Sequence, residues 1–387
     1  MKDIVITAGT ATGSVLALAE AITSEVDCNA YVLCTNEVAC KVFASSRFVK
    51  SAIYINAVDE QIYITEIQNW YKQTEFEHKP ILYFTTDTSC FYIDRNRKWF
   101  ESNFELCLPS SNIIQAFTQK GLAEVKASQA CLSIPKTILV NSKSDIDKVI
   151  SDFEFPVILK PRATYLKKGV DFKIKVIRDE EEFLNFCTKY IESESTLLCQ
   201  EFVPGGNDTS YYYIFYRNKS NDIFENIGKK TLQSTPDGGI MLKGLTEYNK
   251  QLSELSKIFL NTIDYQGIGG IEFKKYNGKF YFIEMSVRLE GFYKICEASN
   301  SYLSLISYYD ITGLEIPSTL KSAKQIDGVV YTDLISTLKY YLKNKNILTA
   351  LQNLTRAVTD PKFKINNFSA KDAKPFMIDL ALKLLRK

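Results

Sequence analysis

Two glutamates in one stretch of alternating side chains could together bind a divalent metal ion. Glu272 and Glu284 lie within residues 267–288, where β-branched and aromatic residues alternate on both sides of Asn277-Gly278, a pattern typical of a β-hairpin. Carboxylate oxygens are ligands that hard divalent cations prefer, and two carboxylates on one face repel each other unless a cation lies between them. Taken alone, the segment fits a charged, solvated hairpin face equally well.

The register of this hairpin decides whether the two glutamates share a face. A plain two-residue turn at Asn277-Gly278 would pair Glu272 with Ile283 and put Glu284 on the opposite face. A three-residue loop with its glycine in the left-handed conformation would pair Glu272 with Phe282 instead. Glu284 would then be a diagonal neighbour on the same face, about 7–8 Å away. Metal binding by both carboxylates requires this second register.

A lysine at the end of an apolar strand is a candidate phosphate-binding group. Lys160 follows the run Phe155-Pro-Val-Ile-Leu, so a buried strand would hold its ammonium group rigidly. The alternative is a lysine whose stem packs in the core while its charged end reaches water. Further on, the apolar run 197–203 breaks into a Pro-Gly turn, where the backbone could bind an adenine edge and nearby acids could bind ribose hydroxyls.

The composition excludes other kinds of chemistry and partner. The 387 residues carry 47 basic and 45 acidic side chains, a net charge of +2, which argues against a general nucleic-acid or membrane-surface binder. The single histidine, His78, excludes a histidine-based zinc site, so chemistry must depend on carboxylates, lysines, arginines and bound metal. The nine cysteines form no Cys-x-x-Cys pair, and we find neither a membrane-spanning apolar run nor a signal peptide. We therefore expect a cytoplasmic protein with reduced thiols.

The elements that must position these residues predict an α/β protein. The N-terminal part is expected to be an open α/β sheet, whose strands lie at residues 3–8, 30–34, 52–55 and 80–85. A second part is expected to contain strands 137–140, 157–160 and 171–177 and helices 144–152 and 179–192. An antiparallel-rich region follows, and helices near 331–343 and 374–386 predict a mostly helical end.

In their order and spacing, these motifs resemble those of ATP-grasp enzymes such as biotin carboxylase, the carbamoyl-phosphate synthetase large chain and D-alanine–D-alanine ligase. The motifs are FPVILKPR at 155–162, QEFVPGGND at 200–208 and IEFKKYNGKFYFIEMSVRLEG at 271–291. Two further elements resemble the carboxylate–amine ligases of that superfamily, namely Ser46-Arg47-Phe48 and the tail Phe368-Ser-Ala-Lys-Asp-Ala-Lys-Pro375. The resemblance therefore covers nearly the whole chain.

The resemblance implies an N-terminal open parallel α/β domain, then the two-lobed ATP-grasp fold (α+β), then a helical C-terminal segment. We expect the N-terminal domain at residues 1–110 and the small ATP-grasp lobe at 111–192. The large lobe with the metal-binding hairpin is expected at 193–310, and the helical segment at 311–387.

The resemblance also implies a set of nucleotide-binding residues. These are Lys120, Lys160, Glu201, Val203, Asp208 and Lys230. Lys160 is expected to grip the α- and β-phosphates, and Lys120 matches a second nucleotide-binding lysine. Lys230 falls where related proteins carry a basic residue that faces the phosphates. Glu201 and the Val203 backbone match the hinge that binds adenine, and Asp208 matches the ribose acid.

The same resemblance implies the metal ligands and the catalytic residues. Glu272, Glu284 and Ser286 match the ligands of Mg²⁺, with two ions expected and Mn²⁺ able to substitute. Arg288, together with Lys160, matches the groups that stabilise the transferring phosphoryl. The family normally has asparagine where this chain has Ser286, and the shorter serine hydroxyl is a poorer ligand for a hard cation.

The activity implied is that of an ATP-grasp ligase that forms carbon–nitrogen bonds. ATP and Mg²⁺ would activate a small-molecule carboxylate as an acyl phosphate, which an amine then attacks. We expect no nucleic-acid or membrane partner, and homodimerisation stays open. The alternatives are another ATP-grasp enzyme, of the carboxylase or carbamoyl type, and a non-catalytic ATP-binding scaffold.

Overall fold

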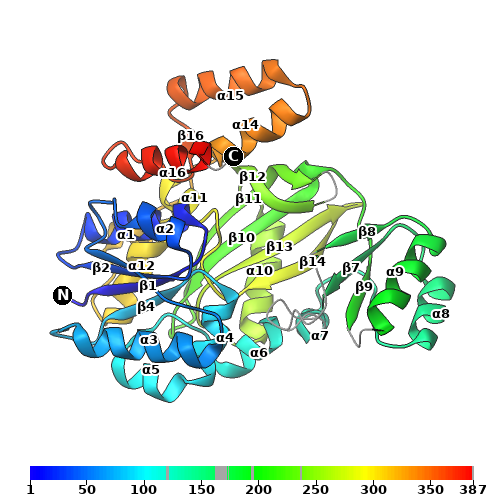
Figure 1. The fold of residues 1–387 in the computed structure, drawn as a ribbon, viewed down its shortest axis with the longest axis horizontal. Coiled ribbons are helices and arrows are strands. Elements are labelled where there is room, and N and C mark those ends of the chain that lie inside the picture. The colour runs from blue at the N-terminus through cyan, green and yellow to red at the C-terminus, as the bar shows by residue number, and fades with distance from the viewer. Residues whose placement is uncertain (119–121, 162–171, 173, 193–195, 236–237, 386–387) are drawn as a thin grey trace.

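The N-terminal part is an open sheet of five parallel strands in the order β3-β2-β1-β4-β5 (Figure 1). The computed structural model describes residues 1–118, 122–161, 172, 174–192, 196–235 and 238–385. The strands are β1 (Ile4–Ala8), β2 (Ala30–Cys34), β3 (Ser51–Tyr54), β4 (Ile81–Phe84) and β5 (Glu105–Leu106). The predicted parallel α/β domain is thus confirmed, with β1 to β4 within one residue of the positions expected from the apolar runs. The two-residue strand β5 was not expected from the sequence.

Helices cover both faces of this sheet. They are α1 (Thr12–Thr23), α2 (Glu37–Phe43), α3 (Glu60–Gln73), α4 (Asp87–Arg95) and α5 (Arg97–Asn103). The side chains of Asn36, Asp59 and Thr86 accept hydrogen bonds from the first turns of α2, α3 and α4 and so fix where these helices begin. Buried residues of α1 and α2 pack on one face of the sheet, and those of α3, α4 and α5 pack on the other.

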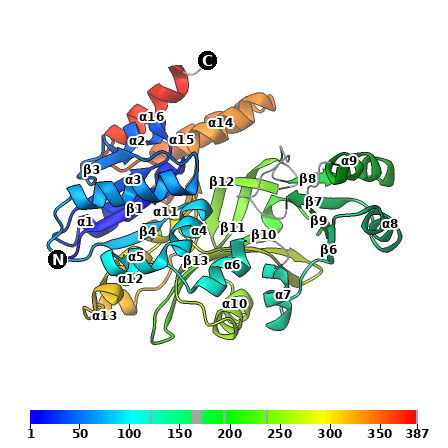
Figure 2. The ribbon, with the colours of Figure 1, turned by 60° about the horizontal axis from the view of Figure 1, so that its bottom comes forward.

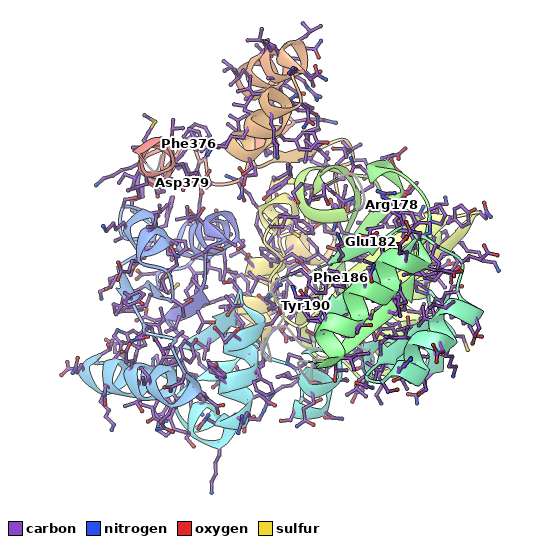
Figure 3. All side chains as sticks on the ribbon, turned by 45° about the vertical axis from the view of Figure 1, so that its right-hand side comes forward. Arg178, Glu182, Phe186, Tyr190, Phe376 and Asp379 are labelled. Atoms are coloured by element: carbon purple, nitrogen blue, oxygen red, sulfur yellow. The ribbon has the colours of Figure 1, made fainter. Side chains whose placement is uncertain are left out.

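A small antiparallel sheet forms the next part of the chain. Two helices, α6 (Ser111–Thr118) and α7 (Leu122–Gln129), lead to β6 (Thr137–Val140), β7 (Val157–Pro161), β8 (Lys175–Ile177) and β9 (Leu197–Glu201), in the order β6-β9-β7-β8. Their core packs against α8 (Lys143–Asp152) and α9 (Glu180–Glu192). Figure 3 shows Glu182, Phe186 and Tyr190 along α9; Phe186 and Tyr190 pack together with ring centroids 4.9 Å apart.

A large sheet of seven strands carries the predicted hairpin, in the order β14-β13-β10-β11-β12-β15-β16. Figure 2 shows β10 to β13 side by side in this sheet. Its main strands are β10 (Ser210–Arg217), β11 (Ile223–Thr235), β12 (Gly238–Thr246), β13 (Gly267–Tyr276) and β14 (Lys279–Ser286), and the short helix η1 (Asn207–Thr209) precedes them. The helix α10 (Lys250–Thr262) covers one face of this sheet. Helices α11 (Lys294–Ala298) and α12 (Leu303–Thr312) pack on the other.

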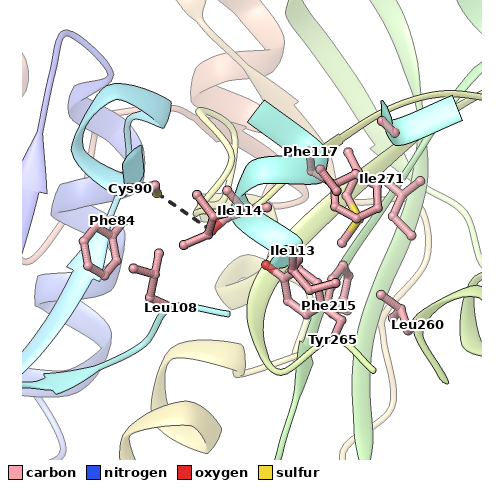
Figure 4. Close-up of a cluster of buried hydrophobic side chains, with 14 of the residues drawn as sticks. Phe84, Cys90, Leu108, Ile113, Ile114, Phe117, Phe215, Leu260, Tyr265 and Ile271 are labelled. Carbon is pink, nitrogen blue, oxygen red and sulfur yellow. Dashed lines mark hydrogen bonds between the residues drawn. The ribbon is translucent and has the colours of Figure 1, made fainter. Parts of the chain in front are cut away.

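One hydrophobic core joins the N-terminal sheet to the large sheet. Figure 4 shows Phe84 of β4, Ile113 of α6 and Phe215 of β10 within the same cluster of buried side chains. A second cluster joins α1 and α2 to α12 on the other side of both sheets. The N-terminal domain therefore packs directly against the large sheet that carries the hairpin.

The C-terminal stretch is less uniformly helical than its sequence indicates. Besides α13 (Ser318–Lys321), α14 (Leu334–Lys343), α15 (Ile347–Thr359) and α16 (Lys374–Leu385), it contains β15 (Val330–Thr332) and β16 (Phe363–Ile365). These strands extend the large sheet beyond β12. Three residues are too few to show a strand period, so the sequence pattern could not reveal them. No helix within the described part of the chain is long and apolar enough to span a bilayer.

Candidate active site

The hairpin β13–β14 brings Glu272 and Glu284 directly opposite each other. Its turn has two residues, Asn277 and Gly278, with positive φ angles of 47° and 77°, as a tight hairpin turn requires. From the turn, the two strands keep the register of a two-residue turn as far as the pair Phe273–Phe282. A β-bulge then shifts the pairing by one residue, so that Glu272 pairs with Glu284. Neither register considered from the sequence is therefore right. The turn is the two-residue one, and the bulge brings Glu284 back to the face of Glu272.

This face of the sheet already receives a positive charge. The Lys230 ammonium group on β11 lies 2.6 Å from a carboxylate oxygen of Glu272, and the lysine is 3% exposed. Burial raises the pKa of Glu272 to about 7; the negative charges of Glu284 and Glu290 add to the rise, and Lys230 opposes it. Lys230 therefore already compensates the charge of Glu272, and Glu284 lies opposite Glu272 on the same face.

Arg288 lies just after β14 and is held by carboxylates from two parts of the fold. Its Nε donates to Asp87 Oδ1 at 2.8 Å, and its Nη1 lies 3.6 Å from Glu290 Oε2. Burial lowers the pKa of Arg288, but the charges of Asp87 and Glu290 outweigh it and hold that pKa above its usual value. Asp87 begins α4, so the N-terminal domain orients the arginine of the large sheet. The sequence reasoning missed Asp87, although its place directly after a parallel strand is where ligand-binding residues gather.

The small sheet buries Lys160 almost completely. The lysine is 3% exposed and its Nζ donates to Gln200 Oε1 at 2.8 Å, from β7 to the adjacent strand β9. Gln200 in turn donates to the Thr137 hydroxyl at 3.2 Å. The lysine is therefore fixed by side chains, and its charged end does not reach out into water as the alternative interpretation required. Gln200, the residue before the predicted hinge, was not singled out from the sequence.

The turn after β9 connects the small sheet to the large one. Glu201 pairs with the backbone of Lys136 on the exposed side, and Val203 is buried at 6% exposure. The Lys274 ammonium group on β13 donates to the carbonyl of Gly205 at 2.9 Å. Asp208 is exposed and lies in η1, which follows β9 and precedes β10 in the chain.

The predicted site residues thus fall into two groups within the described residues. Lys230, Glu272, Glu284, Ser286 and Arg288 belong to the large sheet or its end. The others, Lys160, Glu201, Val203 and Asp208, belong to the small sheet and the turn that follows it. The segment between α7 and β6 touches the hairpin, where the Phe282 N–H donates to the Ser133 carbonyl at 2.8 Å.

Two predicted features cannot be placed in this way. Lys120 and the loop after Lys160, residues 162–171, lie outside the described residues. No preformed group of three or more histidine, cysteine, aspartate or glutamate side chains has metal-site geometry among the residues that the structure describes.

The family model for the ATP-grasp domain matches residues 125–300. The chain is similar to D-aspartate ligase of Enterococcus faecium (strain Aus0004), with 25% identity over 171 residues, 41% of each protein. It is also similar to D-alanine–D-alanine ligase of Petrotoga mobilis (strain DSM 10674 / SJ95), with 30% identity over 132 residues, 33% of this chain and 39% of that protein. The similarity thus spans less than half of the length of these relatives.

Solved structures show the same fold over most of the chain. An N5-carboxyaminoimidazole ribonucleotide synthetase in complex with ADP has a TM-score of 0.64 at 16% identity, covering 90% of this chain and 86% of that one. Biotin carboxylase of Campylobacter jejuni also has a TM-score of 0.64, at 17% identity, covering 83% of this chain and 73% of that one. The N-terminal α/β domain and the ATP-grasp fold expected from the sequence are therefore confirmed.

Proposed function

We propose that this chain is an ATP-dependent carboxylate–amine ligase. The observation that carries the proposal is the shared face of the large sheet, on which Lys230, Glu272 and Glu284 meet. The two curated relatives support it, since both are named as ligases, one for D-aspartate and one for D-alanine. The partial coverage of these relatives leaves the substrates of this chain open, beyond a small-molecule carboxylate and an amine.

In this proposal the nucleotide lies between the two sheets. Lys160 and Lys230 bind its phosphates, the backbone of Val203 and the side chain of Glu201 bind adenine, and Asp208 binds the ribose. Lys160 suits this role because its partner Gln200 fixes the ammonium group before a phosphate arrives. Lys230 can move from Glu272 to a phosphate when a metal ion takes over the charge of the carboxylate.

The chemical step depends mainly on electrostatic stabilisation. Mg²⁺, when bound at Glu272 and Glu284, supplies charge neutralisation for the phosphates of ATP. Arg288, oriented by Asp87, stabilises the negative charge of the transferring phosphoryl group. The substrate carboxylate attacks the γ-phosphorus of ATP, the bond to ADP breaks, and an acyl phosphate forms. The amine then attacks its carbonyl carbon, and phosphate leaves with the proton that the amine loses. No covalent enzyme nucleophile is needed, in keeping with a chain that has one histidine.

The proposal is tested by ADP release with a panel of carboxylates and amines. Glu284→Gln should abolish turnover while circular dichroism shows the native fold. The matched control is Glu247→Gln, because Glu247 pairs at 2.7 Å with Lys229, next to Lys230 in the chain. Full activity of Glu284→Gln would overturn the metal assignment. Bicarbonate belongs in the panel, since turnover with it alone would instead indicate a carboxylase-type enzyme.

A non-catalytic ATP-binding scaffold is the second candidate, and Ser286 is the observation that favours it. Its hydroxyl is a weaker metal ligand than the amide that related enzymes carry there. A protein that binds ADP with ordinary affinity and releases none from ATP with any substrate pair would be such a scaffold. For either candidate we expect a cytoplasmic location, in agreement with the nine free cysteines.

A further inference from the structure

The hairpin formed by α14 and α15 carries a row of exposed apolar side chains that the proposed function does not use. We call the four residues in line along α15 the apolar seam, and they are Ile347, Leu351, Leu354 and Val358. Leu342 and Leu348 lie beside them, and all six side chains are between 42% and 88% exposed. Figure 1 shows α14 and α15 projecting from the rest of the molecule, so a partner can reach the seam.

The side of α15 that faces the molecule is not its apolar side. The buried residues of this helix are Ala350 and Asn353, and the Asn353 amide oxygen accepts a 3.4 Å hydrogen bond from Lys243 of β12. A surface helix of a monomeric protein normally turns its apolar side to the core. In α15 the arrangement is reversed, so the apolar side faces water where a partner would normally cover it.

The spacing of the seam fits a second helix. Its residues follow one another at intervals of four, three and four positions, as the core positions of a coiled coil do. This order of intervals is the same in both directions along the chain. An antiparallel copy of α15 therefore presents matching positions, with Leu351 opposite Leu354 of the second copy. The seam is thus self-complementary, as a contact with two-fold symmetry requires.

The charges on α15 also favour a second copy of this chain. Arg356 is the only charged residue between Ile347 and Val358. Its guanidinium group pairs with Asp360 at 2.7 Å and lies over the Phe363 ring, and its position is on the side of the helix opposite the seam. An uncharged seam suits another uncharged seam better than it suits an anionic lipid surface or a charged protein surface.

The exposed apolar area is of the size that a dimer needs. By their exposed fractions, the six side chains present about 600 Å² to water, which is the upper end for the largest apolar patch on a typical monomer. Stable complexes bury about 800 Å² on each partner. The hairpin therefore supplies most of the area of such an interface from apolar side chains alone.

The tip of the hairpin decides between parallel and antiparallel pairing. Lys343 and Lys345 lie exposed at this tip. A parallel pair of hairpins would bring these like charges of two copies together, whereas an antiparallel pair keeps them at opposite ends of the interface. A parallel pair would also place the two bodies at the same end of the helices, where they would compete for the same space (Figure 1).

We propose that the apolar seam pairs antiparallel with the same seam of a second copy of this chain, so that the protein is a two-fold symmetric dimer joined through α15. The residues of the seam are separate from those proposed to bind nucleotide and metal. Loss of the dimer and loss of ligase activity are therefore measurable independently.

Sedimentation velocity of the full chain tests the proposal. At micromolar concentration the unaltered chain should sediment with twice the 44.1 kDa mass of one chain. Leu351→Lys and Leu354→Glu should each be folded monomers by circular dichroism and sedimentation. Their self-association should weaken at least about a hundredfold, because each symmetric contact would bury two unpaired charges. The control Ile258→Lys, at a position of α10 that is 56% exposed against 55% for Leu351, should stay dimeric.

A mixture of the two variants tests the orientation. In an antiparallel pair the new ammonium group of Leu351→Lys in one copy would lie opposite the new carboxylate of Leu354→Glu in the other. The mixture should therefore form dimers that neither variant forms alone. Absence of dimers in the mixture would overturn the antiparallel pairing.

Two other results would overturn the dimer itself. A dimer that persists in both Leu351→Lys and Leu354→Glu would place the contact on another surface. A monomeric unaltered chain would show that no second copy covers the seam. In that case, vesicles of phosphatidylcholine and phosphatidylglycerol that bind the unaltered chain and not Leu351→Lys would identify a lipid surface as the occupant.

Discussion

The Ser46 hydroxyl donates a 2.5 Å hydrogen bond to the Asp372 carboxylate, and the two residues are 326 positions apart in the chain. The same Asp372 oxygen, Oδ2, accepts a 3.1 Å hydrogen bond from the backbone N–H of Arg47. Close by, the Ser369 hydroxyl donates to Glu20 of α1 at 2.7 Å. The two short motifs near the ends of the sequence are therefore one structural unit, in which the C-terminal tail is fastened to the N-terminal domain.

The Ser46–Asp372 bond should contribute measurably to stability. We expect Ser46→Ala and Asp372→Ala each to lower the free energy of unfolding by about 1–3 kcal/mol, because each leaves a buried or charged partner unsatisfied. The double variant should lose clearly less than the sum, with a coupling energy of about 1 kcal/mol or more. Urea denaturation measures all three, and Lys371→Ala, on the exposed side of the tail, is the control. Strict additivity would show that the two side chains do not interact in solution.

Gly13 in α1 should not tolerate a larger residue. An alanine inside a helix is normally better than glycine by about 0.5–1 kcal/mol. Here its Cβ would lie 1.6 Å from Asn366 Oδ1, so Gly13→Ala should instead destabilise the protein by about 1–3 kcal/mol. Thermal unfolding checks this.

Two further variants show whether the loss of stability comes from the clash with Asn366 or from replacing a glycine as such. Asn366→Ser should relieve the clash in the Gly13→Ala background. Gly291→Ala is the control, since its Cβ would meet nothing closer than 3.9 Å. A Gly13→Ala protein as stable as the original would mean that the tail does not rest on α1.

The alternation of side chains carried more information about the hairpin than its turn did. Phe280 and Phe282 are even-numbered core residues, whereas Met285 and Val287 are odd-numbered, and all four lie on the same buried face. This change of parity marks the bulge, and it was visible in the sequence. The turn residues alone could not reveal it, because they fix the register only near the turn.

The partners of the site residues were not predictable from spacing. Lys160 and Gln200 meet across neighbouring strands, and Arg288 meets Asp87 across two parts of the fold. Period and composition predict which residues are buried within one element, so four of the five strands of the N-terminal sheet were found almost to the residue. Period and composition contain no information on which buried polar groups face each other after packing. Only resemblance to a known fold supplies it.

Lys160 should dominate the affinity for nucleotide if the proposed site is right. Lys160→Met keeps most of the apolar stem and removes the charge, so we expect at least a tenfold loss of ADP affinity, about 1.4 kcal/mol. Calorimetric titration measures this. Lys175→Met is the control, because Lys175 on the adjacent strand β8 pairs with Glu182 on the surface. Equal affinities of the two variants would place the phosphates elsewhere.

The stability of the protein should fall as pH rises through the titration of Glu297. Burial raises the pKa of Glu297 to about 7, although its carboxylate accepts a 3.0 Å hydrogen bond from the Ser304 N–H. The folded chain therefore holds a proton that the unfolded chain releases near its ordinary value of about 4.3. Between these two values the native state binds more protons, so the free energy of unfolding decreases with pH until about pH 7 and then levels off.

Glu297→Gln isolates this contribution, because the amide can still accept the bond from Ser304 and carries no charge at any pH. The difference in unfolding free energy between the variant and the original chain should be small near pH 5. It should grow to about 2–3 kcal/mol in favour of the variant at pH 8. Urea denaturation at a series of pH values measures it, with Glu315→Gln on the exposed surface as the control. A difference that does not change with pH would show that Glu297 is ionised throughout and that solvent reaches it where it meets α12.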